Sequence, residues 1–132
     1  MRTLSFRLKP GQDFLDSIED VVREHNIEAG CILSAVGSFT HAILRLADRE
    51  TYNEYDGHFE IVSATGTISI HGSHIHVSMS DGDGVTIGGH LVRGCAIYTT
   101  AEIVLGIFDD VVYKREVLEN DTGFEELVVH KK

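Results

Sequence analysis

Apolar residues near the N-terminus recur at helical spacing. Over residues 11–25 they fall three or four positions apart, so they would share one face of a helix. The acidic residues Asp13 and Asp16 lie toward the start of this segment, where the helix dipole stabilises negative charge. The pattern predicts one helix over residues 11–25 that ends at Asn26, a residue type that tolerates a left-handed backbone. Its apolar face would consist of Phe14, Leu15, Ile18, Val21 and Val22.

The rest of the chain reads as short β-strands rich in β-branched and aromatic residues. Asp56-Gly57 and the segment 81–84 are typical of hairpin turns, and a change in the phase of alternation predicts a third turn at His71-Gly72. Strands so close in sequence leave no room for the crossover helices of a parallel sheet. We therefore expect an α+β fold, mainly antiparallel β-sheet packed with one main N-terminal helix. The predicted strands cover residues 31–36, 42–46, 59–70, 73–79, 85–89, 95–108 and 125–130.

Length and charge narrow the possible functions. With 132 residues and no linker, repeat or low-complexity stretch, we expect one domain over residues 1–132. Eleven Lys+Arg against 21 Asp+Glu give a net charge of −10, which opposes direct binding to DNA or to an anionic membrane. No apolar run approaches the roughly 20 residues that cross a bilayer, so we expect a cytoplasmic protein without a membrane partner. The two cysteines, Cys31 and Cys95, lack metal-site spacing and are expected in the core.

His74 and His76 carry the clearest chemical signal. They lie two residues apart in a predicted strand, so both imidazoles point to one face while the apolar residues between them point to the other. The turn at 81–84 reverses the chain and would bring His90, which follows two glycines, next to them. Three imidazoles with an open fourth position are the ligands of a catalytic-type zinc site and also accept other divalent transition metals.

A second interpretation of the same three histidines stays open. They would then be half-buried polar residues that form hydrogen bonds within the sheet and hold no ion. The remaining histidines are each most simply explained as solvated side chains, and we assign them no role. They are His25, His41, His58, His71 and His130.

Two carboxylates inside apolar strand runs are candidates for proton transfer. Glu60 and Glu102 would either face solvent or be tied to a cation or to a ligating histidine. Arg93, just after His90, is a candidate anchor for an anionic ligand, or it pairs with an acidic side chain.

Several segments, in this order and at these spacings, resemble the plants-and-prokaryotes-conserved (PPC) domain. The resemblance extends over nearly the whole chain and includes the N-terminal helix. The segments with the strongest resemblance are residues 31–39, 59–69, 74–81 (HIHVSMSD), 88–91 (GGHL) and 99–105 (TTAEIVL).

The resemblance implies a compact antiparallel sheet with a flanking helix, a homotrimer, and a DNA-binding label that comes mostly from plant members with a separate basic hook. Prokaryotic members with the same histidine elements look like metal-site proteins, and the match falls on His74, His76 and His90. The fold is also similar to that of α-acetolactate decarboxylase, whose zinc is held by three histidines, although a shared scaffold does not imply a shared reaction.

Three functional hypotheses follow. The first is a homotrimeric domain whose metal, zinc or another divalent transition metal, binds a small anionic metabolite. The second is a metal-dependent enzyme, decarboxylase- or hydrolase-like, that acts on a small keto acid with Glu60 or Glu102 as the proton-transfer group. The third is a regulatory protein associated with DNA, either directly or through a basic partner recruited by the acidic surface.

Overall fold

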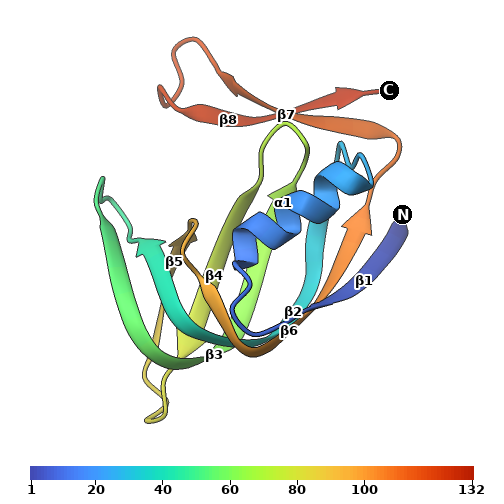
Figure 1. Ribbon diagram of the computed structural model, residues 1–132. Coiled ribbons are helices and arrows are strands. Elements are labelled where there is room, and N and C mark those ends of the chain that lie inside the picture. The colour runs from blue at the N-terminus through green and yellow to red at the C-terminus, as the bar shows by residue number, and fades with distance from the viewer.

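One helix and eight strands make up the protein, in an order that begins with a strand (Figure 1). The computed structural model describes all residues 1–132. The elements are β1 (Arg2–Leu8), α1 (Phe14–Glu24), β2 (Gly30–Arg45), β3 (Tyr52–Ile68), β4 (His74–Ser80), β5 (Thr86–Leu91), β6 (Ala96–Ile107), β7 (Val111–Val117) and β8 (Glu125–Lys131). No helix has the length and apolar character needed to span a membrane.

Six strands form one antiparallel sheet in the order β1-β6-β2-β3-β4-β5. The sheet curves strongly, and α1 lies across its concave side (Figure 1). At one end β5 also pairs with β2, through Leu44 opposite Leu91 and Arg45 opposite His90, so the curved sheet is partly closed on itself. The expected α+β architecture, mainly antiparallel sheet with one helix, is confirmed.

Asp13 fixes the start of α1 and ties it to the sheet. One carboxylate oxygen accepts a hydrogen bond from the Asp16 N–H at 2.9 Å, which caps the helix. The other accepts from the backbone N–H groups of Gly94 and Cys95 at 2.8 and 3.0 Å. At the other end Asn26 has a positive φ of 47°, as its amide side chain tolerates. The helix therefore has the expected apolar face and the expected terminator, but it begins at Phe14, three residues later than predicted.

The core lies between α1 and the concave, inner face of the sheet. Phe14 of α1 and Phe39 of β2 are fully buried and meet edge to face, with ring centroids 5.7 Å apart. Alternate residues of each strand join this core, and the residues between them point to the opposite, outer face. Further fully buried residues are Ile18, Ile27, Leu44, Ile68, Ile75, Met79, Ile97, Ile103 and Leu105.

The predicted turn at Asp56-Gly57 is wrong. Both residues lie inside β3, which continues through them. Gly57 has a φ of 149°, and the register between β2 and β3 shifts between Phe39 and His41, so the Asp-Gly pair forms a local irregularity rather than a reversal. The two strands predicted over 31–36 and 42–46 are also one strand, β2, which continues through the residues between them. The predicted turns at 71–72 and 81–84 do join paired strands.

Two strands, β1 and β7, were not predicted from the sequence. β1 pairs with β6 along its length, with Leu4 opposite Leu105. β7 and β8 form a separate two-stranded sheet at one end of the molecule (Figure 1). Tyr113 of β7 accepts a hydrogen bond from the Ser69 hydroxyl at 2.8 Å, which fastens this hairpin close to the β3–β4 turn.

The two cysteines differ in their environment. Cys95 is fully buried, as expected, and burial raises the pKa of its thiol to about 11. The expectation that Cys31 is buried is wrong, because Cys31 is only partly buried. In the pairing of β2 with β3, Cys31 lies opposite Thr67. Thr67 in turn lies opposite His74 of β4, on the outer face of the sheet.

Candidate metal centre

Strand β4 presents His74 and His76 on the outer face of the sheet. Ile75, Val77 and Met79, which alternate with them, are buried in the core. These apolar residues fix the orientation of the strand, because a shift of one residue would move them to the outer face. The half-buried His74 and the exposed His76 therefore point the same way, as the period of two predicts.

Strand β5 brings the third imidazole alongside. The 81–84 turn reverses the chain, and His90 pairs directly with His76 in the β4–β5 ladder. Gly88 allows close approach of the two strands, because a side-chain carbon there would lie 2.5 Å from the Val77 carbonyl oxygen. We name His74, His76 and His90 the histidine triad.

The triad is compact enough to surround one ion. One ring nitrogen from each residue lies within 4.8 Å of the others, and the Nε2 atoms of His74 and His76 are 3.0 Å apart. Zinc–nitrogen bonds of about 2.0–2.1 Å at tetrahedral angles place two ligand nitrogens roughly 3.4 Å apart. Small rotations of the rings would therefore satisfy tetrahedral coordination.

The protonation of the triad also suits a cation. Burial, and then the charges of His74, Arg45 and His76, lower the pKa of His90 from 6.5 to about 4. Burial and the charge of His76 likewise lower the pKa of His74. His90 also has a buried Nδ1 without any hydrogen-bond partner, and such a group is costly unless something binds it. The residues present thus fit a divalent metal that takes neutral imidazoles.

Comparison with known sequences identifies the family. The profile of the Plants and Prokaryotes Conserved (PCC) domain, also abbreviated PPC, matches residues 1–109. The chain belongs to the PCC domain family. The match includes β1 to β6 and the whole histidine triad.

Two curated relatives of this PCC domain carry the same name and are much longer than this chain. A Synechococcus protein named bifunctional protein GlmU is 40% identical over 131 residues, which are 99% of this chain but 21% of that protein. The chain thus spans about a fifth of the length of the curated relatives it matches.

Two solved structures share both the fold and part of the sequence. A hypothetical protein from Salmonella cholerae-suis superimposes with a TM-score of 0.97 at 33% identity, over 99% of this chain and 94% of that one. A metal-containing protein from Archaeoglobus fulgidus superimposes with a TM-score of 0.81 at 28% identity, over 97% and 94% of the two chains.

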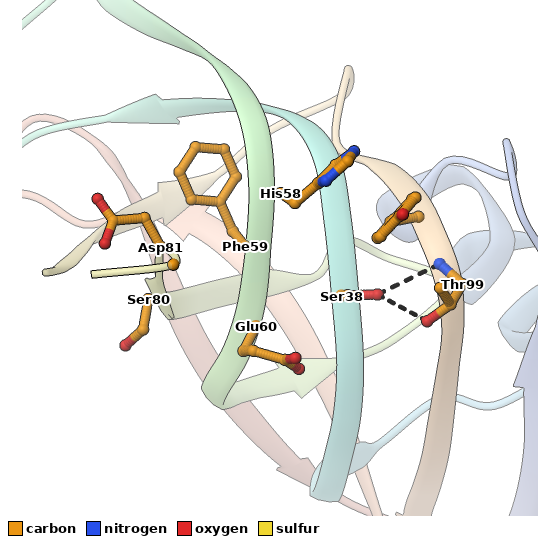
Figure 2. Close-up of a pocket in the computed structure, with 9 residues that line it drawn as sticks. Ser38, His58, Phe59, Glu60, Ser80, Asp81 and Thr99 are labelled. Atoms are coloured by element: carbon orange, nitrogen blue, oxygen red, sulfur yellow. Dashed lines mark hydrogen bonds between the residues drawn. The ribbon is translucent and has the colours of Figure 1, made fainter. Parts of the chain in front are cut away.

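Glu60 of the PCC domain lies away from the triad. In the β3–β4 ladder it faces Ser80, whereas His76 faces Thr65. Ser80 lies four positions after His76 on the same strand, about 13 Å away at roughly 3.3 Å per residue. Glu60 instead lines a separate pocket of about 220 Å³ (Figure 2). This pocket is lined by Ser38, His58, Phe59, Glu60, Ser80, Asp81, Gly82, Tyr98 and Thr99.

Glu102 and Arg93 also lie outside the triad. Glu102 is exposed on β6, opposite Val36 of β2, and β3 separates β2 from β4 in the sheet order. Arg93 forms ion pairs with Asp16, at 2.6 Å, and with Glu19. The two carboxylates raise its pKa, so this guanidinium is already balanced by acids of α1.

Two arginines that the sequence analysis missed flank the triad. Arg45 pairs with His90 between β2 and β5, and Arg115 of β7 donates a hydrogen bond to Thr67, which faces His74. Both charges lower histidine pKa values in the triad. Neither arginine belongs to a local motif, because each reaches the site through a pairing or packing contact that is distant in sequence.

Two of the histidines without an assigned role also make specific contacts. His41 pairs with Asp56, Nδ1 to Oδ1 at 2.6 Å, and His58 stacks on Tyr98 with ring centroids 3.9 Å apart. Both contacts join neighbouring regions of the sheet, and neither histidine belongs to the triad.

Proposed function

We propose that this PCC-domain protein binds one divalent transition metal, zinc or a close relative, through His74, His76 and His90, and that the metal takes a small anionic ligand at its open position. The observation that supports this most directly is the convergence of three ring nitrogens within 4.8 Å on two paired strands. When bound, the metal would supply Lewis acidity toward an anionic donor atom.

The lowered pKa values of His74 and His90 support the same function. Imidazoles that are neutral at physiological pH are ready to ligate a cation without first losing a proton. The Archaeoglobus relative, which is described as metal-containing and shares 28% of the sequence, adds independent support.

Metal analysis of untagged protein tests the proposal. We expect about one bound metal ion per chain in the parent and almost none in the double variant His74→Ala, His76→Ala. The double variant His41→Ala, His58→Ala removes two histidines outside the triad and should keep the parent content. Equal metal content in all three proteins would overturn the proposal.

The protein would assemble as a homotrimer, as the family resemblance implies. Apolar side chains on β2 and β3 support an interface, because Val36 and Val62 are 55% and 58% exposed. The variant Val36→Lys, Val62→Lys should then run as a monomer in light scattering, while Val85→Lys, in the β4–β5 turn, should leave the trimer intact. A monomeric parent protein would contradict the assembly without affecting the metal site.

The proposed role is binding, with no proton-transfer step assigned. Glu60 and Glu102, the candidates for that step, lie on other parts of the sheet. A decarboxylase- or hydrolase-like reaction on a keto acid would need a different proton-transfer group. For a DNA-associated role, the net charge of −10 favours contact through a basic partner over direct contact.

A further inference from the structure

An apolar cavity opens beside one member of the triad. Its volume is about 410 Å³, within the range of roughly 300–1,000 Å³ that small-molecule sites occupy. His90 is the one member of the triad that lines the cavity. Ser73 and Ile75 also line it, and Ile75 points to the inner face of the sheet, opposite to His74. The apolar part of the wall consists of Leu15, Ile43, Tyr52, Ile75, Leu91 and Val92.

Arg93 is the one charged residue that lines this cavity, and Asp16 and Glu19 of α1 already pair with it. Two further arginines lie near the histidine triad without an ion pair. Arg45 lies between Tyr52 of β3 and His90 of β5 in the sheet register, so both of its neighbours line the cavity. Its guanidinium contacts the Arg49 carbonyl at 3.4 Å and forms no ion pair. Arg115 approaches His74 from β7 and likewise lacks an acidic partner, its hydrogen bond going to the Thr67 hydroxyl at 2.7 Å.

The pocket around Glu60 has the opposite character. It contains the carboxylates of Glu60 and Asp81 and no lysine or arginine (Figure 2). An anion would be repelled there, whereas beside His90 it would meet two unpaired guanidinium groups.

We propose that the ligand of this protein is an amphipathic anion, an inference that rests on the proposed metal site. Its anionic head would bind the metal of the triad close to Arg45 and Arg115, and its aliphatic or aromatic part would fill the cavity beside His90. The two arginines form no ion pair within the protein, although the charge of Glu126 also acts at His74, and the cavity offers apolar surface for burial. The ligand class is thus a carboxylate or related metal-binding acid with an apolar tail.

Calorimetry on zinc-loaded protein with two hydroxamates tests this inference. Acetohydroxamate and hexanohydroxamate share the same metal-binding head and differ by four methylenes in the tail. Each buried methylene is worth about fourfold in affinity, so hexanohydroxamate should bind at least about tenfold more tightly. Protein-bound zinc is measured after each titration, so that extraction of the metal is distinguished from binding.

Two variants of α1 locate the tail. Leu15→Gln places a polar group in the cavity wall and should remove most of the preference for hexanohydroxamate. Val21→Gln changes a partly buried residue of the same helix outside the cavity and should keep the preference. Arg45→Gln should weaken both hydroxamates by a similar factor of about three to ten and leave their ratio unchanged.

The outcomes separate this inference from the proposed function. If the parent protein does not bind zinc, the proposed metal site is wrong, and the proposed ligand class is wrong with it. Three results with zinc still bound would overturn the amphipathic ligand alone. They are equal affinity for the two hydroxamates, binding of neither hydroxamate, and a preference for hexanohydroxamate that survives Leu15→Gln.

Discussion

His76 of β4 lies directly opposite His90 of β5, with ring centroids 5.6 Å apart. This pairing is part of a backbone ladder, and His74 belongs to the same strand as His76. The three imidazoles are therefore positioned by hydrogen-bonded strands and not by a flexible loop. Because the strands hold the rings together before any ion arrives, protonation of the triad should be unfavourable in the folded metal-free protein.

The metal-free protein should lose stability as the pH falls from about 6.5 to 4. The folded-state pKa of His90 is about 4, below its ordinary value of 6.5, so the unfolded chain binds more protons between these values. The stabilisation is complete above about pH 6.5 and is lost as the pH falls toward the folded pKa. The lowered pKa of His74 acts in the same direction.

Urea denaturation in the presence of a chelator, at pH 7.5 and pH 4.5, measures this loss. His90→Gln should lose clearly less unfolding free energy between the two pH values than the parent. His25→Gln, at the end of α1, should behave as the parent does. An identical pH dependence of the parent and His90→Gln would show that the burial of His90 does not control this titration.

Zinc should stabilise the protein at neutral pH and lose its effect in acid. A ligand at 100 times its dissociation constant adds about 2.7 kcal/mol to the free energy of unfolding if it binds the folded state only. Protons compete for the same ring nitrogens, so this gain should shrink as the pH falls. Differential scanning fluorimetry with and without zinc, at pH 7.5 and pH 4.5, gives the comparison.

The variant His74→Ala, His76→Ala provides the reference for that experiment. It should show no zinc-dependent shift of Tm at either pH. A zinc shift in the parent that is equal at both pH values would indicate that the ion does not bind through these imidazoles.

The triad itself was predictable from sequence because its geometry is local. The period of two puts His74 and His76 on one face, and a short turn returns the chain so that His90 comes alongside. The surroundings of the triad were not predictable in this way. Arg45 reaches His90 because β5 also pairs with β2, and Arg115 arrives with a hairpin that packs near the β3–β4 turn. No local pattern encodes either contact.

The errors in the prediction have a similar origin. Asp56-Gly57 has the residue types of a tight turn, but the same types also suit an irregularity within a long strand, and only the pairing of β2 with β3 distinguishes the two. Glu60 was a candidate because it lies inside an apolar strand run, a pattern that equally fits a residue on the solvated face. The pattern does not indicate which residues lie nearby along that face.

Gly66 should be essential for the position of His74. Gly66 faces Ile75 in the β3–β4 ladder, and a side-chain carbon there would clash with the His74 carbonyl oxygen and lie 2.9 Å from Ile75 Cγ1. Gly66→Ala must therefore push β4 away from β3, at a cost of about 1–3 kcal/mol. Because the shift moves the strand of His74 and His76, zinc affinity should also fall, by about tenfold or more.

Gly82→Ala is the matched control for this substitution. Gly82 lies in the β4–β5 turn with no atom within 4 Å of the added carbon. Its unfolding free energy should stay within about 0.5 kcal/mol of the parent. Unchanged zinc affinity in Gly66→Ala would mean that the triad does not depend on the spacing between β3 and β4.

Two anchors of α1 should differ greatly in their contribution to stability. Asp13 accepts three backbone hydrogen bonds, one within the helix and two from the chain before β6. Asp13→Ala leaves these donors without their charged acceptor and should cost about 2–4 kcal/mol. Arg93 pairs with Asp16 and Glu19, but its side chain is 61% exposed. Solvent screening therefore limits the cost of Arg93→Gln to less than about 1 kcal/mol.

Urea denaturation at pH 7.5 gives the free energy of unfolding for both variants. Asp13→Asn keeps one acceptor oxygen and the size of the side chain, so its loss should fall between those of Asp13→Ala and Arg93→Gln. If Arg93→Gln were as destabilising as Asp13→Ala, the surface ion pairs would be the main tether of α1. The helix would then be held by charge at the surface rather than by hydrogen bonds to the sheet.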